Sequence, residues 1–338
     1  MFPKSFESTS VVLDGSLRDG WSGTPVVTTD EVTVPVHAVG LHYGQIAFEG
    51  LRARVMDGRG EAFRPDLHWE RLCRSMSRLA MPEIDRSAFD LALGLLLARI
   101  PDHGRADEYL YVRPIVVAMD ADWGMGGATS FRLHVVAGWT REAFDRVPHV
   151  VALVEAQRRR SWPGGTGDVK IPANYGPAFA AQRRARAAGA HTVLWLDPED
   201  RTVEEFSSMN AVVVDDAGRL LAPAPGATVL DGVTRRTIVE LARDAGMVVD
   251  EGPLRWPDPF AGEEGVRGVL LATGTAAGMA VVHEVTESSA GGEARTWRSS
   301  TGGDAFAELR TLVDACLWGD GRPEWWVPAD RLTGTAVS

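Results

Sequence analysis

Apolar and polar residues alternate along several short stretches of the first 140 residues, a pattern typical of half-buried β-strands. Strands are expected at 32–39, 45–55, 109–119 and 131–139, with a turn at 57–60 leading into a strand at 61–63. Two helices are expected between these strands. The first has Asp66 as its cap, and the second begins with the capping-box pair Ser87 and Asp90 and runs to about Ile100. The pattern predicts a small α+β domain over residues 1–137.

Beyond this domain, short apolar strands alternate with helices, and glycine-rich turns separate them. Strands are expected at 150–155, 192–196, 203–206, 211–214 and from 270 onward, and helices at 174–188 and 231–246. The stretch 138–150 is mixed in character and lacks a clear period, which indicates an interdomain loop. Residues 151–338 then form a second, larger domain. The chain is therefore expected to have two domains of mixed α and β structure.

Length and composition exclude several classes of protein. The chain has 338 residues, 45% of them hydrophobic, which is enough for two ordinary cores. No apolar run approaches the roughly 18 residues of a membrane-spanning helix, and the N-terminus lacks a secretory pattern. The net charge of −11 argues against a nucleic-acid scaffold. Only Cys73 and Cys316 are available for disulfides, and no side-chain cluster has metal-ligand spacing, so we expect a cytoplasmic protein without a metal centre.

Lysine is unusually scarce in this chain, which narrows any chemistry that needs an amine. Of the 35 basic residues, only Lys4 and Lys170 are lysines. Lys4 lies near a terminus that is expected to fray, whereas Lys170 follows the glycine-rich loop 161–168 and precedes a helix. A lysine partly removed from water in such a place can form a Schiff base with a carbonyl or with pyridoxal phosphate (PLP). Taken alone, Lys170 also fits a solvated surface residue.

PLP would need three further groups: a phosphate cradle, a carboxylate for the pyridine nitrogen and a partner for the phenolate oxygen. Candidates for the cradle are the helix start at 232–234 and the turn at 274–275. In the strand 203–206, alternation is expected to direct either Glu204 or Glu205 inward. Each feature also has an ordinary structural explanation, as a turn or as exposed surface, so none identifies the site alone.

In their order and spacing, several motifs resemble those of the branched-chain amino acid aminotransferases, class IV enzymes of PLP fold type IV. Those of the large domain are GGTGDVKIPANYGPAFAAQ, VLWL, VEEFSSMN, LDGVTRRTI and ATGTAA. Those of the small domain are HYGQIAFEGLRAR, FRPDLHWERL and YVRP. The resemblance covers about residues 34–285. It implies a small α+β domain, a larger mixed α/β domain that is β-barrel-like, and PLP at the interface between the two domains.

The resemblance also implies a role for particular residues. Lys170 would be the catalytic lysine that forms the Schiff base with PLP and moves the proton at the substrate Cα. Tyr175 would bind the phenolate oxygen and Glu205 the pyridine nitrogen. The implied phosphate contacts are Arg71, Val233, Thr234 and Thr275. The implied substrate pocket contains Tyr43, Phe48, Tyr111, Trp139, Thr275, Ala276 and Arg113, the last of these for the distal carboxylate of glutamate.

The chain departs from the family pattern beside these residues. Residues 171–173 (Ile-Pro-Ala) replace the usual glycines after the lysine, and the proline removes a backbone donor. Residues 206–207 (Phe-Ser) replace the usual pair after the glutamate, and the loop 119–127 also differs. Ala277 and Ala280 stand where some relatives carry two cysteines, which excludes a redox switch at that place.

The implied reaction is PLP-dependent transamination between a branched-chain or similar hydrophobic L-amino acid and 2-oxoglutarate, giving a 2-oxo acid and L-glutamate. A homodimer is expected by the same resemblance, with small-molecule substrates and no nucleic acid or membrane as partner. Because the departures surround Lys170 and Glu205, two alternatives stay open. One is a pathway-specialised fold type IV enzyme, an aminotransferase or lyase, that acts on a non-standard amino acid. The other is a catalytically silent homologue.

Overall fold

The chain forms two compact units in a computed structural model that describes residues 6–102, 105–257, 267–288 and 294–334. Unit 1 comprises residues 1–142, 169–173 and 324–338, and unit 2 comprises residues 143–168 and 174–323. The five-residue segment that contains Lys170 thus belongs to unit 1, although the sequence around it belongs to unit 2. The domain ranges 1–137 and 151–338 stay predictions.

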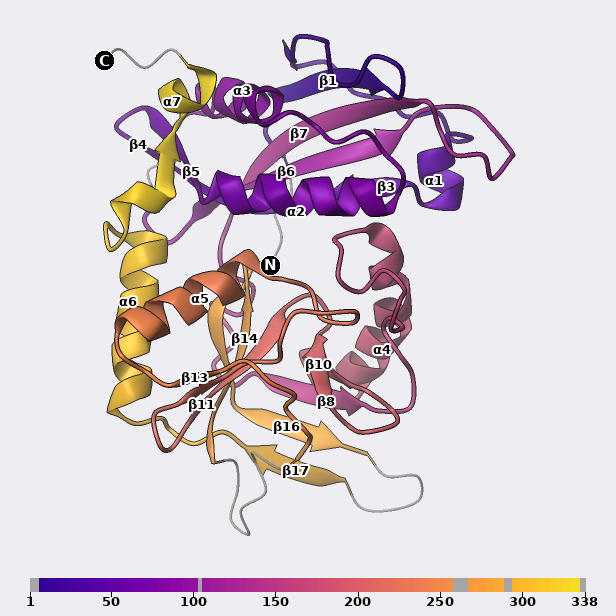
Figure 1. The fold of residues 1–338 in the computed structure, drawn as a ribbon. Coiled ribbons are helices and arrows are strands. Elements are labelled where there is room, and N and C mark those ends of the chain that lie inside the picture. The colour runs from indigo at the N-terminus through magenta and orange to yellow at the C-terminus, as the bar shows by residue number, and fades with distance from the viewer. Residues whose placement is uncertain (1–5, 103–104, 258–266, 289–293, 335–338) are drawn as a thin grey trace. The chain divides into compact units, whose positions relative to one another are not determined.

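Unit 1 is built on one antiparallel sheet of eight strands, in the order β18-β5-β4-β6-β7-β1-β2, with β3 paired to β6. The strands are β1 Ser10–Ser16, β2 Val26–Thr28, β3 Ile46–Phe48, β4 Leu51–Met56, β5 Arg59–Phe63, β6 Tyr109–Ala118, β7 Ser130–Thr140 and β18 Trp326–Pro328. The helices are α1 Val39–Tyr43, α2 Pro65–Arg78, α3 Arg86–Leu97 and α7 Ala329–Thr333. Figure 1 shows α2 and α3 lying along this sheet.

The core of unit 1 follows from the alternation that the sequence shows. Along β7 the side chains of Phe131, Leu133 and Val135 are buried and those between them are half-buried, so one face of the strand joins the core. On the helices, Leu72 of α2 and Phe89 of α3 are buried in the same cluster. Burial of these apolar side chains is what joins the helices to the sheet.

Three local expectations for unit 1 are wrong. Residues 32–39 form no strand; they lead through a turn into α1, and Val36 is 80% exposed. The cap of α2 is Arg64, which has a left-handed backbone and is followed by Pro65 as the first helical residue, so Asp66 lies inside the first turn. The capping box of α3 does not form either, because the helix begins after Asp85 and has no side-chain cap.

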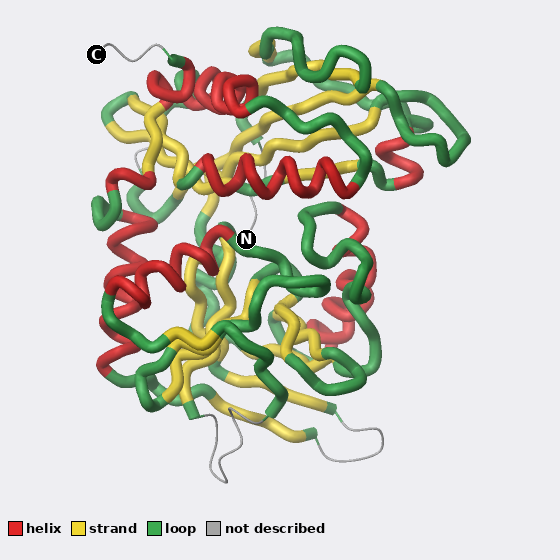
Figure 2. Tube along the Cα trace, viewed as in Figure 1, coloured by secondary structure: helices red, strands yellow, loops and turns green. Residues whose placement is uncertain are grey.

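Unit 2 contains a mixed sheet of ten strands, in the order β13-β12-β11-β10-β9-β8-β16-β17, with β14 paired to β11 and β15 paired to β14. The strands are β8 Val151–Glu155, β9 Thr192–Leu196, β10 Val203–Phe206, β11 Asn210–Asp215, β12 Leu220–Leu221, β13 Val249–Asp250, β14 Gly268–Gly274, β15 Gly278–Val282, β16 Glu284–Glu287 and β17 Arg295–Arg298. The helices are α4 Gly176–Ala187, α5 Val233–Asp244 and α6 Asp304–Trp318. Figure 2 distinguishes these helices from the strands that they accompany.

Two features of unit 2 position the residues discussed below. A 3-10 turn at Pro172–Tyr175 comes before α4, so this helix starts two residues later than the sequence indicates. Strands β10, β11 and β14 are neighbours through the pairs Glu205 with Asn210 and Asn210 with Thr273. The ends of these three strands therefore bring together segments that are about 70 residues apart in the sequence.

The expected interdomain loop begins too early. Gly138, Trp139 and Thr140 belong to the end of β7, where they pair with β6. The pairing runs without interruption from Tyr109 with Thr140 to Ala118 with Phe131. Trp139 is consequently a strand residue of unit 1 rather than part of a connection.

Candidate active site

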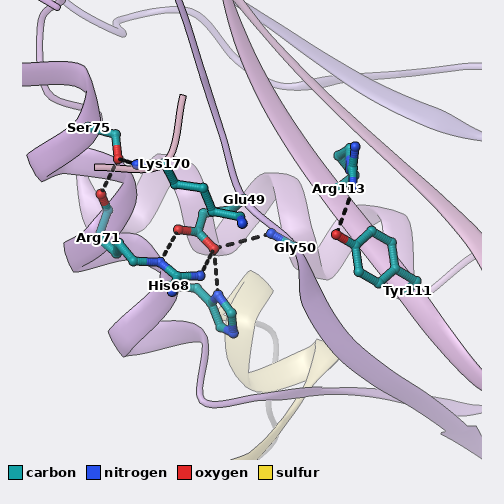
Figure 3. Close-up of polar contacts among 8 residues, drawn as sticks. All are labelled: Glu49, Gly50, His68, Arg71, Ser75, Tyr111, Arg113 and Lys170. Carbon is teal, nitrogen blue, oxygen red and sulfur yellow. Dashed lines mark hydrogen bonds and ion pairs between the residues drawn. The ribbon is translucent and has the colours of Figure 1, made fainter. Parts of the chain in front are cut away.

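In unit 1, the backbone around Lys170 is held by hydrogen bonds from both directions. Its N–H donates to the Ser75 hydroxyl at 2.9 Å, and its carbonyl accepts from the Phe48 N–H at 3.2 Å. The neighbouring residues Val169 and Ile171 are buried. The Lys170 amine lies 4.9 Å from the centre of the Phe48 ring, which faces it in a cation–π contact. A half-buried lysine in a loop is thereby fixed against β3 and α2 (Figure 3).

Beside it lies a fully buried carboxylate with two basic partners. Glu49, which separates β3 from β4, is 0% exposed and accepts hydrogen bonds from the Arg71 Nε and Nη2 atoms at 2.7 and 2.8 Å. The His68 Nδ1 atom lies 2.7 Å from the same carboxylate, and the Gly50 N–H donates to it at 3.2 Å. Arg71 and His68 both come from α2 and are themselves buried. Figure 3 shows the side chains of Arg71 and His68 and the Gly50 N–H converging on the Glu49 oxygens.

The charges of this cluster follow from its contacts. Burial alone would raise the pKa of Glu49, but the Arg71 guanidinium and the hydrogen bond from His68 hold that pKa well below its usual range. Burial lowers the pKa of His68, and the positive charges of Arg71 and Lys170 lower it further, against the opposing effect of Glu49. His68 is therefore a neutral imidazole, and Nδ1 is its donor because the Glu49 carboxylate can only accept.

The expected pocket residues Phe48, Tyr111 and Arg113 lie together next to the lysine. The Arg113 Nη2 atom donates to the Tyr111 hydroxyl at 2.8 Å, and its guanidinium carbon lies 5.1 Å from the centre of the Phe48 ring. Tyr111 is buried and passes so close to Gly50 that a Cβ there would be 2.1 Å from the hydroxyl oxygen. Only glycine fits at position 50, which explains the Glu-Gly pair between β3 and β4.

Tyr43 and Trp139, also expected in the pocket, have different surroundings. Tyr43 ends α1, is 45% exposed and donates to the Trp123 carbonyl at 2.7 Å. It is therefore fastened to the loop 119–127, the one that departs from the family pattern. Trp139 is half-buried and packs against the core of unit 1. The structure thus brings together Phe48, Tyr111, Arg113 and Lys170, whereas it places Tyr43 on the rim of unit 1.

In unit 2, Glu205 is buried at the end of β10 among hydrogen-bond donors. The Arg160 Nη1 atom lies 3.2 Å from one carboxylate oxygen, and the Leu230 N–H donates to the other at 3.1 Å. The Asn210 side-chain amide lies 3.5 Å from the same oxygen and also donates to the Leu230 carbonyl at 2.8 Å. These partners favour an ionised carboxylate, which suits a positively charged ring nitrogen.

The start of α5 lies next to this carboxylate. Val233 and Thr234 form its buried first turn, and no side chain caps their N–H groups. A Cβ on Gly232 would lie 1.9 Å from the Asn210 Oδ1 atom, so the backbone approaches Asn210 closely. Because Asn210 also pairs with Thr273, the turn 274–277 that contains Thr275 and Ala276 is at the same end of the sheet. The N–H groups of an uncapped helix start can bind an anion such as a phosphate.

Tyr175 occupies the cap position of α4 and is half-buried. The residue before it, Asn174, donates to the Thr166 carbonyl at 2.6 Å and accepts from the Thr166 hydroxyl at 2.8 Å. These two bonds fasten the glycine-rich loop to the start of the helix. The loop is thus a structural element that sets the position of Tyr175, not only a flexible connection.

The sequence reasoning missed several charged residues of the two groups. Glu49 and His68 lie within two of the small-domain motifs but receive no role from the resemblance, and Arg160 belongs to a short basic block. That block has a structural role, since Arg159 pairs with Asp197 at 2.5 Å and Arg160 pairs with Glu205. Both glutamates of the 203–206 strand are buried, so exposure does not distinguish the one expected to face inward, and that expectation stays a prediction. The burial of Glu204 and Glu205 depends on the strands that flank β10, which the local sequence does not show.

The residue types in the two units fit PLP. Unit 1 supplies a half-buried primary amine and a buried guanidinium, and unit 2 supplies a buried carboxyl group paired with an arginine and a helix start whose N-cap residue is a glycine. These are the groups that an aldehyde, a phosphate and a pyridine nitrogen require. Within the described ranges, no group of three or more potential ligands could hold a metal ion. None of the described helices has both the length and the apolar character that crossing a membrane requires.

Comparison with known proteins places the chain in a family. The family model of class IV amino-transferases matches residues 46–285. A probable branched-chain-amino-acid aminotransferase of Staphylococcus epidermidis is 33% identical over 282 residues, which cover 82% of this chain and 78% of that protein.

Two solved structures show the same fold. The branched-chain aminotransferase of Thermoproteus uzoniensis, determined with norvaline, has a TM-score of 0.74 at 22% identity and covers 95% of this chain and 99% of its own. A T.th. branched-chain amino acid aminotransferase, complexed with N-(5'-phosphopyridoxyl)-L-glutamate, has a TM-score of 0.73 at 24% identity, covering 94% and 97%. The family and the fold type that the motifs predict are confirmed. The chain belongs to the class IV aminotransferases and is a PLP-dependent enzyme of that family.

Proposed function

We propose that this enzyme transfers the amino group of a branched-chain or similar hydrophobic L-amino acid to 2-oxoglutarate, giving a 2-oxo acid and L-glutamate. The observation that carries the proposal is the grouping of the Lys170 amine with Phe48, Tyr111 and Arg113 in unit 1. The names of its relatives support the same choice of substrates. One solved structure of similar fold was determined with norvaline, and another with a phosphopyridoxyl derivative of glutamate.

The residues proposed to hold PLP come from both units. Arg71, together with Val233, Thr234 and Thr275, would bind the phosphate, and Tyr175 the phenolate oxygen. When bound, PLP supplies a carbonyl that carries the amino group and a pyridine ring that accepts electrons. Glu205 would keep a proton on the pyridine nitrogen, because an ionised carboxylate stabilises the positive charge there.

Lys170 is the proposed base that removes the proton from the substrate Cα and returns it. Its surroundings support this role, since its backbone is fixed at both the N–H and the carbonyl. A base must stay within reach of one particular hydrogen, and rigid support of this kind limits its movement. The neutral state of His68 leaves the amine and Arg71 as the basic groups beside Glu49.

The pocket residues suit two kinds of side chain. The Phe48 ring offers an apolar surface for a branched-chain substrate, and Arg113 offers a guanidinium for the distal carboxylate of glutamate. The guanidinium lies over Phe48 and is tied to the Tyr111 hydroxyl, so its charge is held at the edge of the apolar surface. Ala276 and Thr275 would contact the substrate carboxylate from unit 2. Tyr43 and Trp139 stay proposed pocket residues.

The oligomeric state and the cellular location are two further proposals. We propose a homodimer, which the family resemblance implies. We also propose a cytoplasmic location, where the buried residues Cys73 and Cys316, which form no disulfide, would stay reduced.

The assignment of Lys170 is tested by Lys170→Ala. Loss of the only proposed base is expected to lower the rate of 4-methyl-2-oxopentanoate formation from L-leucine and 2-oxoglutarate by about 1000-fold or more. The chain offers a matched control in Lys4→Ala, the only other lysine, which is expected to keep the wild-type rate. Product formation is measured by a coupled dehydrogenase assay. Turnover that survives in the Lys170 variant would overturn the assignment.

The role of Arg113 is tested by Arg113→Met. Removing the guanidinium deletes a charge-assisted contact, so kcat/KM for L-glutamate should fall about 10- to 100-fold. The same constant for L-leucine should change by less than about threefold, because the methionine side chain keeps an apolar contact with Phe48. The two half-reactions are followed separately by stopped-flow absorbance. Equal losses for both substrates would show that Arg113 only supports the fold.

The buried ion pair is tested by Glu49→Gln, which leaves Arg71 buried without an opposite charge. The free energy of unfolding should fall by about 3 kcal/mol at pH 7. Because the pKa of Glu49 is lowered from 4.5, this contribution is present above that pH and is lost as the solution is acidified below it. Urea unfolding of the PLP-free protein measures the difference.

The control is Glu61→Gln, since the pair between Arg54 and Glu61 on the same sheet keeps contact with solvent, with side chains 16% and 25% exposed. It is expected to cost less than about 1 kcal/mol. Equal losses in the two variants would contradict a special role for Glu49.

A further inference from the structure

Glu204 is a buried carboxyl group that the proposed chemistry does not use. It lies on β10 next to Glu205, and 2% of it is exposed. Neither of its carboxyl oxygens has a hydrogen-bond partner of normal geometry among the described residues. Buried carboxylates are nearly always paired, so an isolated one needs an explanation.

The groups around Glu204 are charged or polar and come from three other segments. Arg160 approaches from the loop after β8, Asp197 from the end of β9 and Thr228 from the loop before α5, while Glu205 is its neighbour on the strand. Asp197 is occupied by Arg159, which donates to both of its oxygens. Arg159 is thus occupied, and Arg160 is the arginine whose positive charge acts on Glu204.

Arg160 has one donor that is not used. Its Nη1 atom pairs with Glu205 and its Nη2 atom donates to the Thr228 carbonyl at 2.5 Å, but its buried Nε has no partner within the described part of the chain. Among the described residues, one buried cluster thus contains an unpaired donor on Arg160 and, on Glu204, a carboxyl group with no ion pair, whose interaction with the Thr228 side chain falls short of normal hydrogen-bond geometry. An ionised Glu204 would therefore attract the same guanidinium that pairs with Glu205.

The protonation state of Glu204 decides how strong that attraction is. Burial raises the pKa of Glu204 to about 7; Thr228 and Arg160 oppose this change, and Asp197 and Glu205 add to it. Near neutral pH the group therefore exists in both forms. The protonated form has little attraction for Arg160, whereas the ionised form attracts it strongly.

We propose that Glu204 is a positioning residue of the cofactor site, which when ionised competes with Glu205 for Arg160 and when protonated leaves that pair undisturbed. The inference rests on the proposed function, because Glu205 is the proposed partner of the pyridine nitrogen. On ionisation the proton goes to solvent, and a negative charge appears next to Glu205. That charge makes it easier for the pyridine nitrogen to keep its proton. Because the protonated ring accepts electrons more readily, the reactivity of the cofactor would depend on pH near 7.

The titration itself is tested on the PLP-free protein with Glu204→Gln, which imitates the protonated form. A raised carboxyl pKa means that the folded state keeps a proton that the unfolded state has lost, so wild-type stability falls as pH rises from 4.5 to about 7. The variant lacks this loss. Its melting temperature relative to wild type should therefore rise by about 3 °C or more between pH 5 and pH 8.

Glu199→Gln is the matched control, because Glu199 belongs to the same set of ion pairs through Arg159 but is 81% exposed. It should show no such change with pH. A difference between Glu204→Gln and wild type that is constant from pH 5 to pH 8 would overturn the proposal. If the glutamine variant does not fold, Glu204→Met replaces it. A carboxyl resonance that titrates near pH 7 in carbon-13-labelled wild-type protein, and is absent from that variant, gives the same answer.

The coupling to the cofactor is tested on the PLP-loaded enzyme. The value of kcat/KM for L-leucine should change about two- to tenfold through an inflection near pH 7 in wild type and in Glu199→Gln, and the inflection should be absent from Glu204→Gln. An inflection that persists in Glu204→Gln, or is missing from wild type, would overturn the coupling. Absence of leucine turnover in all three proteins would instead contradict the proposed function, and the stability measurement would still decide whether Glu204 titrates.

Discussion

The arrangement of unit 1 depends on the buried ion pair between Glu49 and Arg71. A carboxylate with no solvent exposure is tolerated only where opposite charge and hydrogen bonds compensate for lost hydration, and here the guanidinium donates twice while His68 donates once. The pair joins the break between β3 and β4 to the middle of α2. One turn further along α2, Ser75 accepts from the Lys170 backbone, so the same helix that carries Arg71 also supports the lysine.

Charge compensation also organises unit 2, but there it is incomplete. Arg160 satisfies Glu205, and Arg159 satisfies Asp197, whereas Glu204 has neither an ion pair nor a hydrogen bond of normal geometry within the described ranges. Burial therefore favours its protonated form, in contrast to Glu49, whose partners favour the ionised form. Two buried carboxyl groups in one chain thus differ in charge near neutral pH because their neighbours differ.

Much of the fold could be predicted from the sequence where the signal is local. The strand 192–196 and the helix within 231–246 follow from continuous apolar character and from helical spacing. Residues 32–39 show why the same reasoning fails elsewhere: valines alternate there as in a strand, but no neighbouring strand pairs with them among the described residues. The predicted cap of α2 at Asp66 is wrong for a related reason, since the left-handed backbone at Arg64 and the proline after it determine where the helix begins.

For the proposed site, motifs pointed to Lys170 and Glu205 but not to the charged residues that pair near them. Glu49 meets Arg71 across 22 residues of sequence, and Arg160 meets Glu205 across 45. Such pairings depend on which strands and helices become neighbours, which no local pattern contains. Lys170 could be proposed as the functional lysine because the chain has so few alternatives, whereas the charges around it became visible only in three dimensions.

The central claim is that Lys170 is the residue that binds PLP covalently, and chemical trapping tests it most directly. The PLP-loaded protein is reduced with sodium borohydride, digested and mapped by mass spectrometry, so that any Schiff base becomes a stable phosphopyridoxyl group on its lysine. The account predicts the label on the peptide that contains Lys170 and none on Lys4. A label on Lys4 alone, or no label on a protein that binds PLP, would contradict it.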